Sequence, residues 1–473
     1  MSAIFYCRSS IYTAIRRCSG SSIMLTRSLK RTGSADEDIS PPPSKRRVAS
    51  TTTGNAVANF FKPASKKDPE QVTFKTRHET LLVAQYNKTS GNSNVHPKPP
   101  VKIAAFDLDD TLIATKSGNT FSRSPDDWRW WHPIVPSRLQ QLHADGFHII
   151  VVTNQGGVKL KTDPKAPNGS MKSVANFKTK VTAVLNSLNL PITLYAATGA
   201  DMYRKPRTGM WTQMVEDLGM HDNDEALDLE KSVFVGDAAG REGDKAAKIK
   251  KDHSCSDRNF ATNVGIPFQT PEQFFLDKVV EPYTQSFDPE TFLVSADSVE
   301  TPTVDFKKNH DVELVLFCGS PGSGKSTFYW RQMESLGYAR VNQDLLKTRD
   351  KCMRAASELL EEGRSVVVDN TNADVETRAL WIGLAKKFNV PIRLIHFTCS
   401  AKLCEHNDTV RALGGELMNP ESRTLLPKMA FTGFTARYRE PKIEEGFEDI
   451  TRVDFLFDGT DEQRAIWRRH WIS

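Results

Sequence analysis

The sequence predicts an α/β protein with two doubly wound parallel-sheet domains behind a disordered N-terminal tail. Apolar runs of strand length alternate with helical stretches from about residue 100 to 283 and again after 311. Nearly continuous apolar strands of this kind are typical of parallel sheets that are covered on both faces. A chain of 473 residues is also too long for one hydrophobic core.

Composition separates the tail from the domains. We assign residues 1–95 to the tail, 96–283 to the first domain, 284–310 to a linker and 311–473 to the second domain. The tail is rich in Ser, Thr, Pro and basic residues, which predicts disorder. Residues 1–100 carry a net charge of +10 and the remainder carries −5, so the overall +5 says little about the domain surfaces.

The composition also bounds the class of protein. The seven cysteines form no C-x-x-C pair, so we expect reduced thiols in an intracellular protein. The sequence contains no run of about 18 apolar residues, so we expect no membrane-spanning helix.

The tail contains three short patterns that predict addresses or a docking peptide. Residues 1–35 lack acids and mix arginine with serine, as a mitochondrial transit peptide does; a generic basic tail is the alternative. Residues 41–47, PPPSKRR, form a candidate nuclear address, and initiation at Met24 would keep it while removing much of the transit-like segment. Phe60 and Phe61 resemble a degenerate sliding-clamp docking peptide, although an incidental aromatic pair is the favoured interpretation. We therefore expect a nuclear protein, with the mitochondrion as a second compartment.

The strands expected in the first domain are 101–106, 147–152, 192–196 and 232–235. The first of them runs directly into FDLDDTL at 106–112, which contains Asp107 and Asp109. In open α/β sheets the reactive crevice lies beyond the carboxyl ends of the strands, and alternate residues of an extended chain face the same side. Such a carboxylate pair suits covalent phosphoryl transfer, in which one attacks phosphorus and the other protonates the leaving oxygen.

This pattern resembles the haloacid-dehalogenase phosphatases, and the other motifs of that family follow in order. Thr153 and Asn154 end the second strand, where the threonine hydroxyl would bind phosphoryl oxygens. Arg204 and Lys205 lie in YRKP at 203–206, and the lysine would neutralise charge on the phosphoryl group. Asp237 ends the fourth strand. We expect Asn154 and Arg204 to contact substrate.

The resemblance implies a role for each carboxylate. Asp107 would be the nucleophile and Asp109 the general acid and base. Asp107, Asp237 and the main-chain carbonyl of Asp109 would hold Mg²⁺, which prefers hard oxygen ligands. Asp257 would support this metal site or form a structural salt bridge, and the sequence does not distinguish the two.

The second domain begins with a P-loop. Its strands are expected at 312–317, 365–368 and 391–397, and GSPGSGKST follows the first of them at 319–327. This matches G-x-x-x-x-G-K-[ST] between a strand and a helix, where backbone N–H groups bind phosphates. Lys325 would contact the β- and γ-phosphates of ATP and Ser326 would ligate Mg²⁺. The expected nucleotide contacts are Gly319, Gly322, Ser323, Gly324, Lys325, Ser326 and Thr327.

Four further residues are candidates for activating and positioning the phosphate acceptor. Asp344 follows the P-loop by about twenty residues and would take the proton of the acceptor hydroxyl. Asp369 and Asn370 follow the strand 365–368, and Asp369 would bind metal, position the acceptor or cap the next helix. Arg411, on a helical stretch at 401–413, would close over the ATP phosphates, with a surface salt bridge as the alternative.

The order of the two domains makes the resemblance more specific. A phosphatase motif set precedes a P-loop, with VGDAAGR at 235–241, TGMW at 208–211 and DNTN at 369–372. Over roughly residues 100–460 the chain resembles the polynucleotide kinase 3′-phosphatase family. The resemblance implies removal of 3′-phosphates and ATP-dependent phosphorylation of 5′-hydroxyls at DNA strand breaks, so that a ligase can seal them. We expect a monomer with no membrane association, and a sliding clamp or ligase contact through the tail.

The sequence departs from this family in two places. Residues 1–95 lack the strand pattern of the forkhead-associated domain that animal relatives carry, and Asp110 stands where Gly is frequent. Two segments are candidate nucleic-acid contacts. The aromatic residues Trp128, Trp130 and Trp131 would stack on bases or pack as buried aromatics, and Lys159, Lys161, Lys165 and Lys172 would follow a phosphate backbone or form a solvated loop.

Three alternative functions remain. An RNA end-healing enzyme would use the same chemistry, although its known relatives of phage type place the kinase first. A fusion of a metabolic phosphatase with a small-molecule kinase would act on free sugar phosphates. The intact motifs argue against a scaffold without catalysis.

Overall fold

The computed structural model describes residues 71–86, 99–122, 124–161, 167–221, 223, 225–243, 251–293 and 305–472. The addresses and the docking peptide expected in the tail, and Lys165, lie outside these residues.

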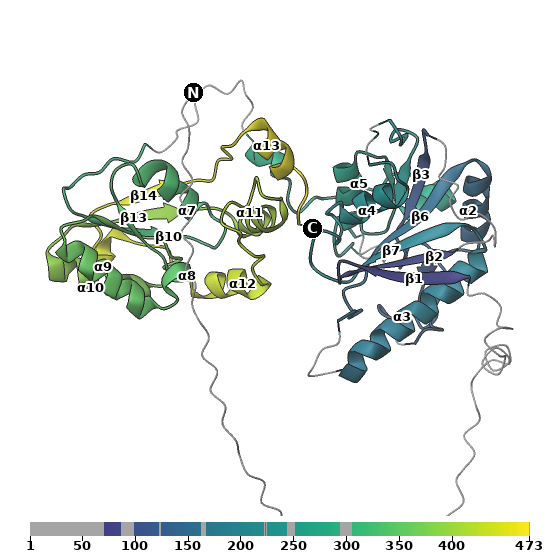
Figure 1. Ribbon diagram of the computed structural model, residues 1–473, viewed down its shortest axis with the longest axis horizontal. Helices are drawn as coiled ribbons and strands as arrows, with labels where there is room; N and C mark the ends of the chain where they lie inside the picture. The colour runs from purple at the N-terminus through teal and green to yellow at the C-terminus, as the bar shows by residue number, and fades with distance from the viewer. Residues whose placement is uncertain are drawn as a thin grey trace, which may run out of the picture. The chain divides into compact units, whose positions relative to one another are not determined.

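A seven-stranded sheet organises the first domain (Figure 1). Its strand order is β1-β2-β7-β6-β3-β8-β9, and β4 and β5 form a separate pair. The strands are β1 (Val72–Arg77), β2 (Leu81–Tyr86), β3 (Lys102–Phe106), β4 (Ile113–Ala114), β5 (Arg129–Trp130), β6 (Phe147–Asn154), β7 (Ile192–Ala197), β8 (Val233–Val235) and β9 (Phe268–Gln269). The helices are α2 (Val135–Ala144), α3 (Pro167–Leu188), α4 (Gly209–Asp217), α5 (Ser256–Val264), α6 (Pro271–Leu276) and the 3₁₀ helix η2 (Pro289–Phe292).

This sheet is mixed, which corrects the prediction of a parallel sheet. β3, β6, β7, β8 and β9 are parallel to their neighbours in this group, but β2 pairs antiparallel with both β1 and β7. β1 and β2 also lie within residues 1–95, so the prediction of disorder was wrong for residues 72–86. β2 (LLVAQY) is buried except at Gln85, and β7 pairs with it over its whole length. Long-range pairing orders a short apolar segment that polar sequence surrounds.

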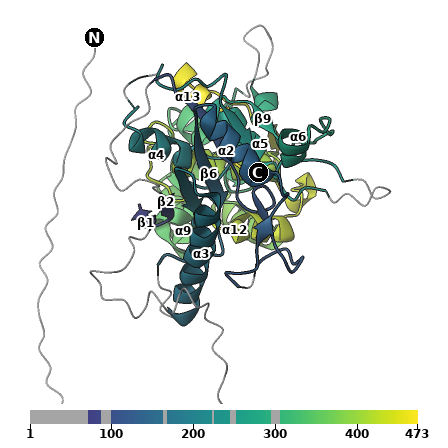
Figure 2. The same cartoon turned by 90° about the vertical axis from the view of Figure 1, so that its right-hand side faces the viewer.

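Helices cover both faces of the sheet. Leu139 of α2 and Val181 and Leu185 of α3 belong to the core on one face. Met214 of α4 and Phe260 of α5 belong to the core on the other. Figure 1 shows these two helix pairs on opposite sides of the strands, and Figure 2 shows α3 beside β1 and β2, which it contacts. The expected α/β class is confirmed for this domain.

A five-stranded parallel sheet organises the second domain, in the order β11-β12-β10-β13-β14. The strands are β10 (Leu314–Cys318), β11 (Ala339–Val341), β12 (Val366–Val368), β13 (Ile392–Phe397) and β14 (Ile450–Val453). The helices are α7 (Lys325–Phe328), the π-helix η3 (Tyr329–Met333), α8 (Gln343–Leu346), α9 (Arg349–Glu361), α10 (Val375–Phe388), α11 (Ala401–Leu413), α12 (Lys428–Arg437), the 3₁₀ helix η4 (Ile443–Glu445) and α13 (Asp461–Trp467). The parallel sheet expected for this domain is confirmed.

Buried apolar side chains fill both sides of this second sheet. Leu360 of α9 and Trp381 of α10 belong to one core. Tyr329 and Met333 of η3 belong to the other, together with Phe306. Phe306 lies in the range expected to be linker, so the end of that range packs into the second domain.

Polar side chains cap the helices that carry or border the second site. Thr348, Asp374 and Ser400 each accept a hydrogen bond from a backbone N–H in the first turn of α9, α10 and α11. Asn342 caps α8 in the same way and so fixes the start of the helix that carries Asp344. Among the described residues, no helix combines the length and apolar character needed to cross a membrane.

Candidate active sites

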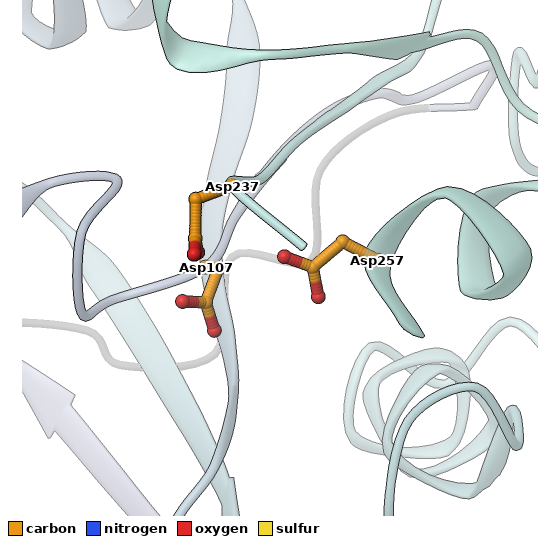
Figure 3. A group of neighbouring side chains, drawn as sticks. All are labelled: Asp107, Asp237 and Asp257. Carbon is orange, nitrogen blue, oxygen red and sulfur yellow. The ribbon is translucent and has the colours of Figure 1, made fainter. Parts of the chain in front are cut away.

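Three carboxylates converge at the carboxyl end of the first sheet. Asp107 follows β3 and Asp237 follows β8, and these two strands are neighbours. Asp257 comes from the first turn of α5. One ligand oxygen from each residue lies within 4.8 Å of those of the other two, and Figure 3 shows the carboxyl groups directed toward one another. The structure therefore brings the predicted nucleophile and two candidate metal supports together.

Lys205 is the cation of this carboxylate cluster. Its Nζ lies 2.6 Å from Asp107 Oδ1 and 2.8 Å from Asp257 Oδ1, and it donates a 2.7 Å hydrogen bond to the carbonyl of Val152. The residue is 3% exposed. Asp257, for which two roles were predicted, thus belongs to the cluster and also pairs with the lysine.

Burial and repulsion shift the pKa values in this cluster. Burial raises the pKa of Asp107 to about 7, against the opposing charge of Lys205. Burial, and then the charges of Asp257 and Asp107, raise the pKa of Asp237 well above its usual value. For Lys205, burial alone would lower the pKa, but Asp107 and Asp257 outweigh it and the pKa is raised. Three carboxylates around one lysine are undercompensated, and their hard oxygen atoms fit a divalent cation.

Two positions beside this cluster have special backbone requirements. Gly236 lies so close to Asp257 that a Cβ atom there would be 2.3 Å from Asp257 Oδ2. Glycine is therefore required where β8 meets α5. Asp110 has φ 56°, which lies in the left-handed region that glycine favours and that aspartate tolerates. This explains how Asp110 occupies a position where Gly is frequent.

The Asp109 carboxylate has partners of its own. Lys180 Nζ lies 3.0 Å from Oδ1, and Gln155 Nε2 donates a 2.7 Å hydrogen bond to Oδ2. The same Gln155 nitrogen lies 3.0 Å from Thr153 Oγ1. The predicted acid and the predicted phosphoryl ligand therefore share one amide. Gln155 and Lys180 were not predicted as site residues; the only signal for Gln155 was its place directly after the motif.

Asn154 holds the segment that carries Lys205. Its Oδ1 accepts a 2.9 Å hydrogen bond from Lys205 N, and its Nδ2 donates a 3.1 Å bond to Lys205 O. This geometry makes Asn154 a positioning residue, and its contact with substrate stays a prediction. The guanidinium of Arg204 lies against the loop after β6, 3.3 Å from where a Cβ of Gly156 would be.

In the second site, the P-loop surrounds its lysine. Lys325 Nζ donates to the carbonyls of Gly319 and Ser320 at 3.0 and 2.6 Å. Burial lowers its pKa. Gly322 has φ 77°, and a Cβ there would lie 2.3 Å from Cys404 O, so α11 packs directly against the loop. Ser323 is buried and Thr327 is exposed.

Asp369 binds the P-loop serine. Ser326 Oγ donates a 2.8 Å hydrogen bond to Asp369 Oδ2. Arg340 donates from Nε to the same oxygen at 2.8 Å and lies 2.9 Å from Ser326 Oγ. Of the three roles open for Asp369, metal binding fits this geometry, whereas helix capping does not, because Asp374 caps α10. Arg340 was not predicted, because it lies within a strand and belongs to no motif.

The predicted acceptor base pairs with an arginine. Asp344 Oδ2 lies 2.6 Å from Arg423 NH1, and 68% of the Asp344 side chain is exposed. Asn370 Oδ1 accepts a 2.8 Å hydrogen bond from Gln343 N, so it links the end of β12 to the first residue of α8, the helix that carries Asp344. Arg411 pairs with Asp408. Its role as a lid over the ATP phosphates stays a prediction.

The outcome differs between the two candidate nucleic-acid contacts, the tryptophan segment and the lysine loop. Trp128, Trp130 and Trp131 are partly buried and pack against the core of the first domain, in agreement with the alternative of buried aromatics. Lys161 pairs with Glu79 of the β1–β2 turn. A backbone contact by the lysine loop stays a prediction.

Comparisons with known proteins match both halves of the chain. The family model described as polynucleotide kinase 3 phosphatase matches residues 102–275. A second model, described as an AAA domain, matches residues 314–358 and 347–441.

Relatives extend these matches over most of the chain. A bifunctional polynucleotide phosphatase/kinase of Schizosaccharomyces pombe is 41% identical over 378 residues, which cover 80% of this chain and 83% of that protein. A putative bifunctional polynucleotide phosphatase/kinase of Acanthamoeba polyphaga mimivirus is 33% identical over 403 residues, covering 81% and 92%. A polynucleotide 3′-phosphatase of Saccharomyces cerevisiae is 30% identical and covers 38% of this chain and 90% of its own length.

Proposed function

The chain belongs to the family of bifunctional polynucleotide phosphatase/kinases, and on this premise we propose that it heals DNA strand breaks. It removes a 3′-phosphate and phosphorylates a 5′-hydroxyl with ATP, which leaves ends that a ligase can seal. The observation that carries this proposal is the presence of both sites on one chain. The carboxylate cluster around Asp107 ends one sheet, and the P-loop around Lys325 follows a strand of another.

The 3′-phosphatase reaction has two steps. The Asp107 carboxylate attacks phosphorus, the bond from phosphorus to the 3′-oxygen breaks, and Asp109 donates a proton to that oxygen. A water molecule then attacks the aspartyl phosphate, Asp109 takes its proton, and Asp107 and inorganic phosphate are released. Lys205 lies 2.6 Å from Asp107 and offsets negative charge in both steps. Mg²⁺ held by Asp107 and Asp237, with Asp257 beside them, would supply further positive charge.

The 5′-kinase reaction uses the second site. Asp344 accepts the proton of the 5′-hydroxyl, the 5′-oxygen bonds to the γ-phosphorus of ATP, and the bond to the β-phosphate oxygen breaks, which releases ADP. Lys325 and the P-loop N–H groups hold the β- and γ-phosphates. Mg²⁺ held by Ser326 and Asp369 would offset the charge of these phosphates. Arg423 holds the Asp344 carboxylate through a 2.6 Å ion pair.

The expected partners and locations rest on the tail. We include in the proposal a nuclear address at 41–47, a mitochondrial address in 1–35, and a sliding clamp or ligase contact around Phe60, in a monomeric protein. Imaging of chains that start at Met1 and at Met24 tests the addresses, because identical distributions would contradict them.

A nicked DNA duplex with a 3′-phosphate and a 5′-hydroxyl tests the function. Incubation with the full chain, ATP and Mg²⁺, followed by ligase, is expected to seal the nick only when the protein is present. The matched arm replaces the strands around the nick with RNA, and preferential sealing there would favour RNA healing. Activity on free sugar phosphates together with inactivity on both duplexes would overturn the proposal.

A further inference from the structure

Lys180 and Gln155 together engage both oxygens of the Asp109 carboxylate. Lys180 lies 71 residues away in the sequence, on α3, and pairs with Oδ1 at 3.0 Å, while Gln155 donates to Oδ2 at 2.7 Å. Neither residue belongs to a motif that predicts the phosphatase chemistry. Together they hold the carboxylate that is predicted to act as acid and base in the reaction.

The pair between Lys180 and Asp109 differs from an ordinary surface salt bridge. The Lys180 side chain is 10% exposed, whereas that of Asp109 is 49% exposed. A buried ammonium group without a partner would be costly, so the carboxylate is held firmly from the protein side. The Asp109 side chain meanwhile stays open to solvent, where a leaving oxygen can approach.

Asp109 pairs with a different lysine from the one in the metal-binding cluster. Among the described residues, the metal-binding cluster consists of Asp107, Asp237 and Asp257, and Lys205 is its cation. Asp109 lies two residues after the nucleophile and has a different cation. Each carboxylate group therefore has its own lysine.

We propose that Lys180, assisted by Gln155, is a positioning residue that holds Asp109 in the orientation needed for proton transfer to the 3′-oxygen. This inference rests on the proposed phosphatase function. In each turnover the proton moves from Asp109 to the leaving oxygen and is regained from the attacking water. Lys180 keeps its own protons throughout and contacts neither phosphorus nor the leaving group.

Leaving groups with different needs for a proton test this role. A 3′-phosphorylated oligonucleotide releases an alkoxide that must be protonated, whereas nitrophenyl phosphate releases a phenolate that needs no proton. Lys180→Met is expected to slow the first turnover of the oligonucleotide about 30-fold, within the contribution of a general acid, and to leave the first burst of nitrophenolate within about twofold. Lys180→Arg, which preserves the charge, is expected to restore most of the oligonucleotide rate.

Lys178→Met is the matched control. Lys178 lies on the same helix as Lys180, and its Nζ contacts the Phe74 ring at 5.2 Å. The control is expected to leave both first-turnover rates unchanged. Equal slowing of both substrates by Lys180→Met, or no slowing of either, would overturn the inference. If that variant does not fold, Gln155→Met undergoes the same comparison. A wild-type protein without activity on the oligonucleotide would instead refute the proposed function.

Discussion

The buried side chain of Arg378 is expected to contribute strongly to the stability of the second domain. It lies in α10 with no exposed surface, and its Nε and NH2 each donate a 2.7 Å hydrogen bond to the Glu445 carboxylate. Its NH1 donates to the carbonyls of Asn372, Ala373 and Arg439 at 3.3, 3.1 and 3.0 Å. Arg378→Met fills a similar volume but removes the three nitrogens that donate these five hydrogen bonds.

The expected loss of stability follows from these contacts. Removal of one partner of a buried ion pair costs about 3–5 kcal/mol, because the other charge stays buried without compensation. A loss of about 4 kcal/mol corresponds to a fall in melting temperature of roughly 10 °C for a domain of this size. Two of the freed carbonyls, those of Asn372 and Ala373, lie just after Asp369, so 5′-phosphorylation is expected to fail at a lower temperature as well.

Calorimetry of the full chain, with both activities measured after heating, provides the assay. We expect the kinase transition to fall while 3′-dephosphorylation persists, because the two sheets have separate cores. Arg452→Met is the matched control: it breaks the exposed pair with Glu440 and is expected to cost less than about 1 kcal/mol. A second variant, Arg378→Met with Glu445→Leu, is expected to recover part of the loss, since no buried charge then stays unpaired.

Two results would refute this reasoning. One is a loss for Arg378→Met no larger than that for Arg452→Met. The other is an equal fall of the phosphatase transition, which would show that the two domains do not unfold independently.

Other substitutions probe the sites and cores. Asn154→Ala removes two hydrogen bonds to Lys205, so we expect kcat of dephosphorylation to fall about tenfold with KM within about twofold; steady-state kinetics that show only a higher KM would favour a substrate contact instead. Burial lowers the pKa of His406 to about 3. Below the ordinary value of 6.5 the unfolded state therefore binds a proton that the folded state does not, and stability falls by up to about 1.4 kcal/mol per pH unit as the pH drops toward 3. Denaturant titrations at pH 7 and about pH 4.5 give the free energy of unfolding at each pH. This free energy should change less between the two pH values in His406→Leu than in the wild type, and an equal change would contradict the prediction. Trp128→Ala should destabilise the first domain by about 2 kcal/mol in thermal melts and leave KM for an oligonucleotide within about twofold, whereas a higher KM at unchanged stability would indicate base stacking.

The strands that carry motifs could be predicted because their apolar runs are dense and end in polar residues. β3, β6, β7 and β8 lie within about a residue or two of the expected ranges. β1 was missed because Val72–Arg77 is a mostly exposed edge strand with polar side chains, and β2 was missed because it is one short apolar run within polar sequence. The pairing of β2 with β7 joins segments more than a hundred residues apart, which local sequence pattern does not report.

The site could be predicted as far as each motif supplies its own side chains. Asp107, Asp237 and Lys205 meet because strand ends gather at one edge of a parallel sheet. Lys180 and Arg340 could not be predicted, since a lysine on a helix and an arginine inside a strand carry no pattern of their own. Only the packing of α3, and the adjacency of β11 and β12, brings them to Asp109 and Asp369.

One chain carries two active sites on separate sheets, and paired variants test their independence most directly. Phosphate release from a 3′-phosphorylated oligonucleotide and ATP-dependent labelling of a 5′-hydroxyl are measured on folded Asp107→Asn and Lys325→Met. We predict that Asp107→Asn abolishes phosphate release and labels 5′-ends at the wild-type rate, and that Lys325→Met does the reverse. Loss of both activities in either folded variant would contradict two independent sites.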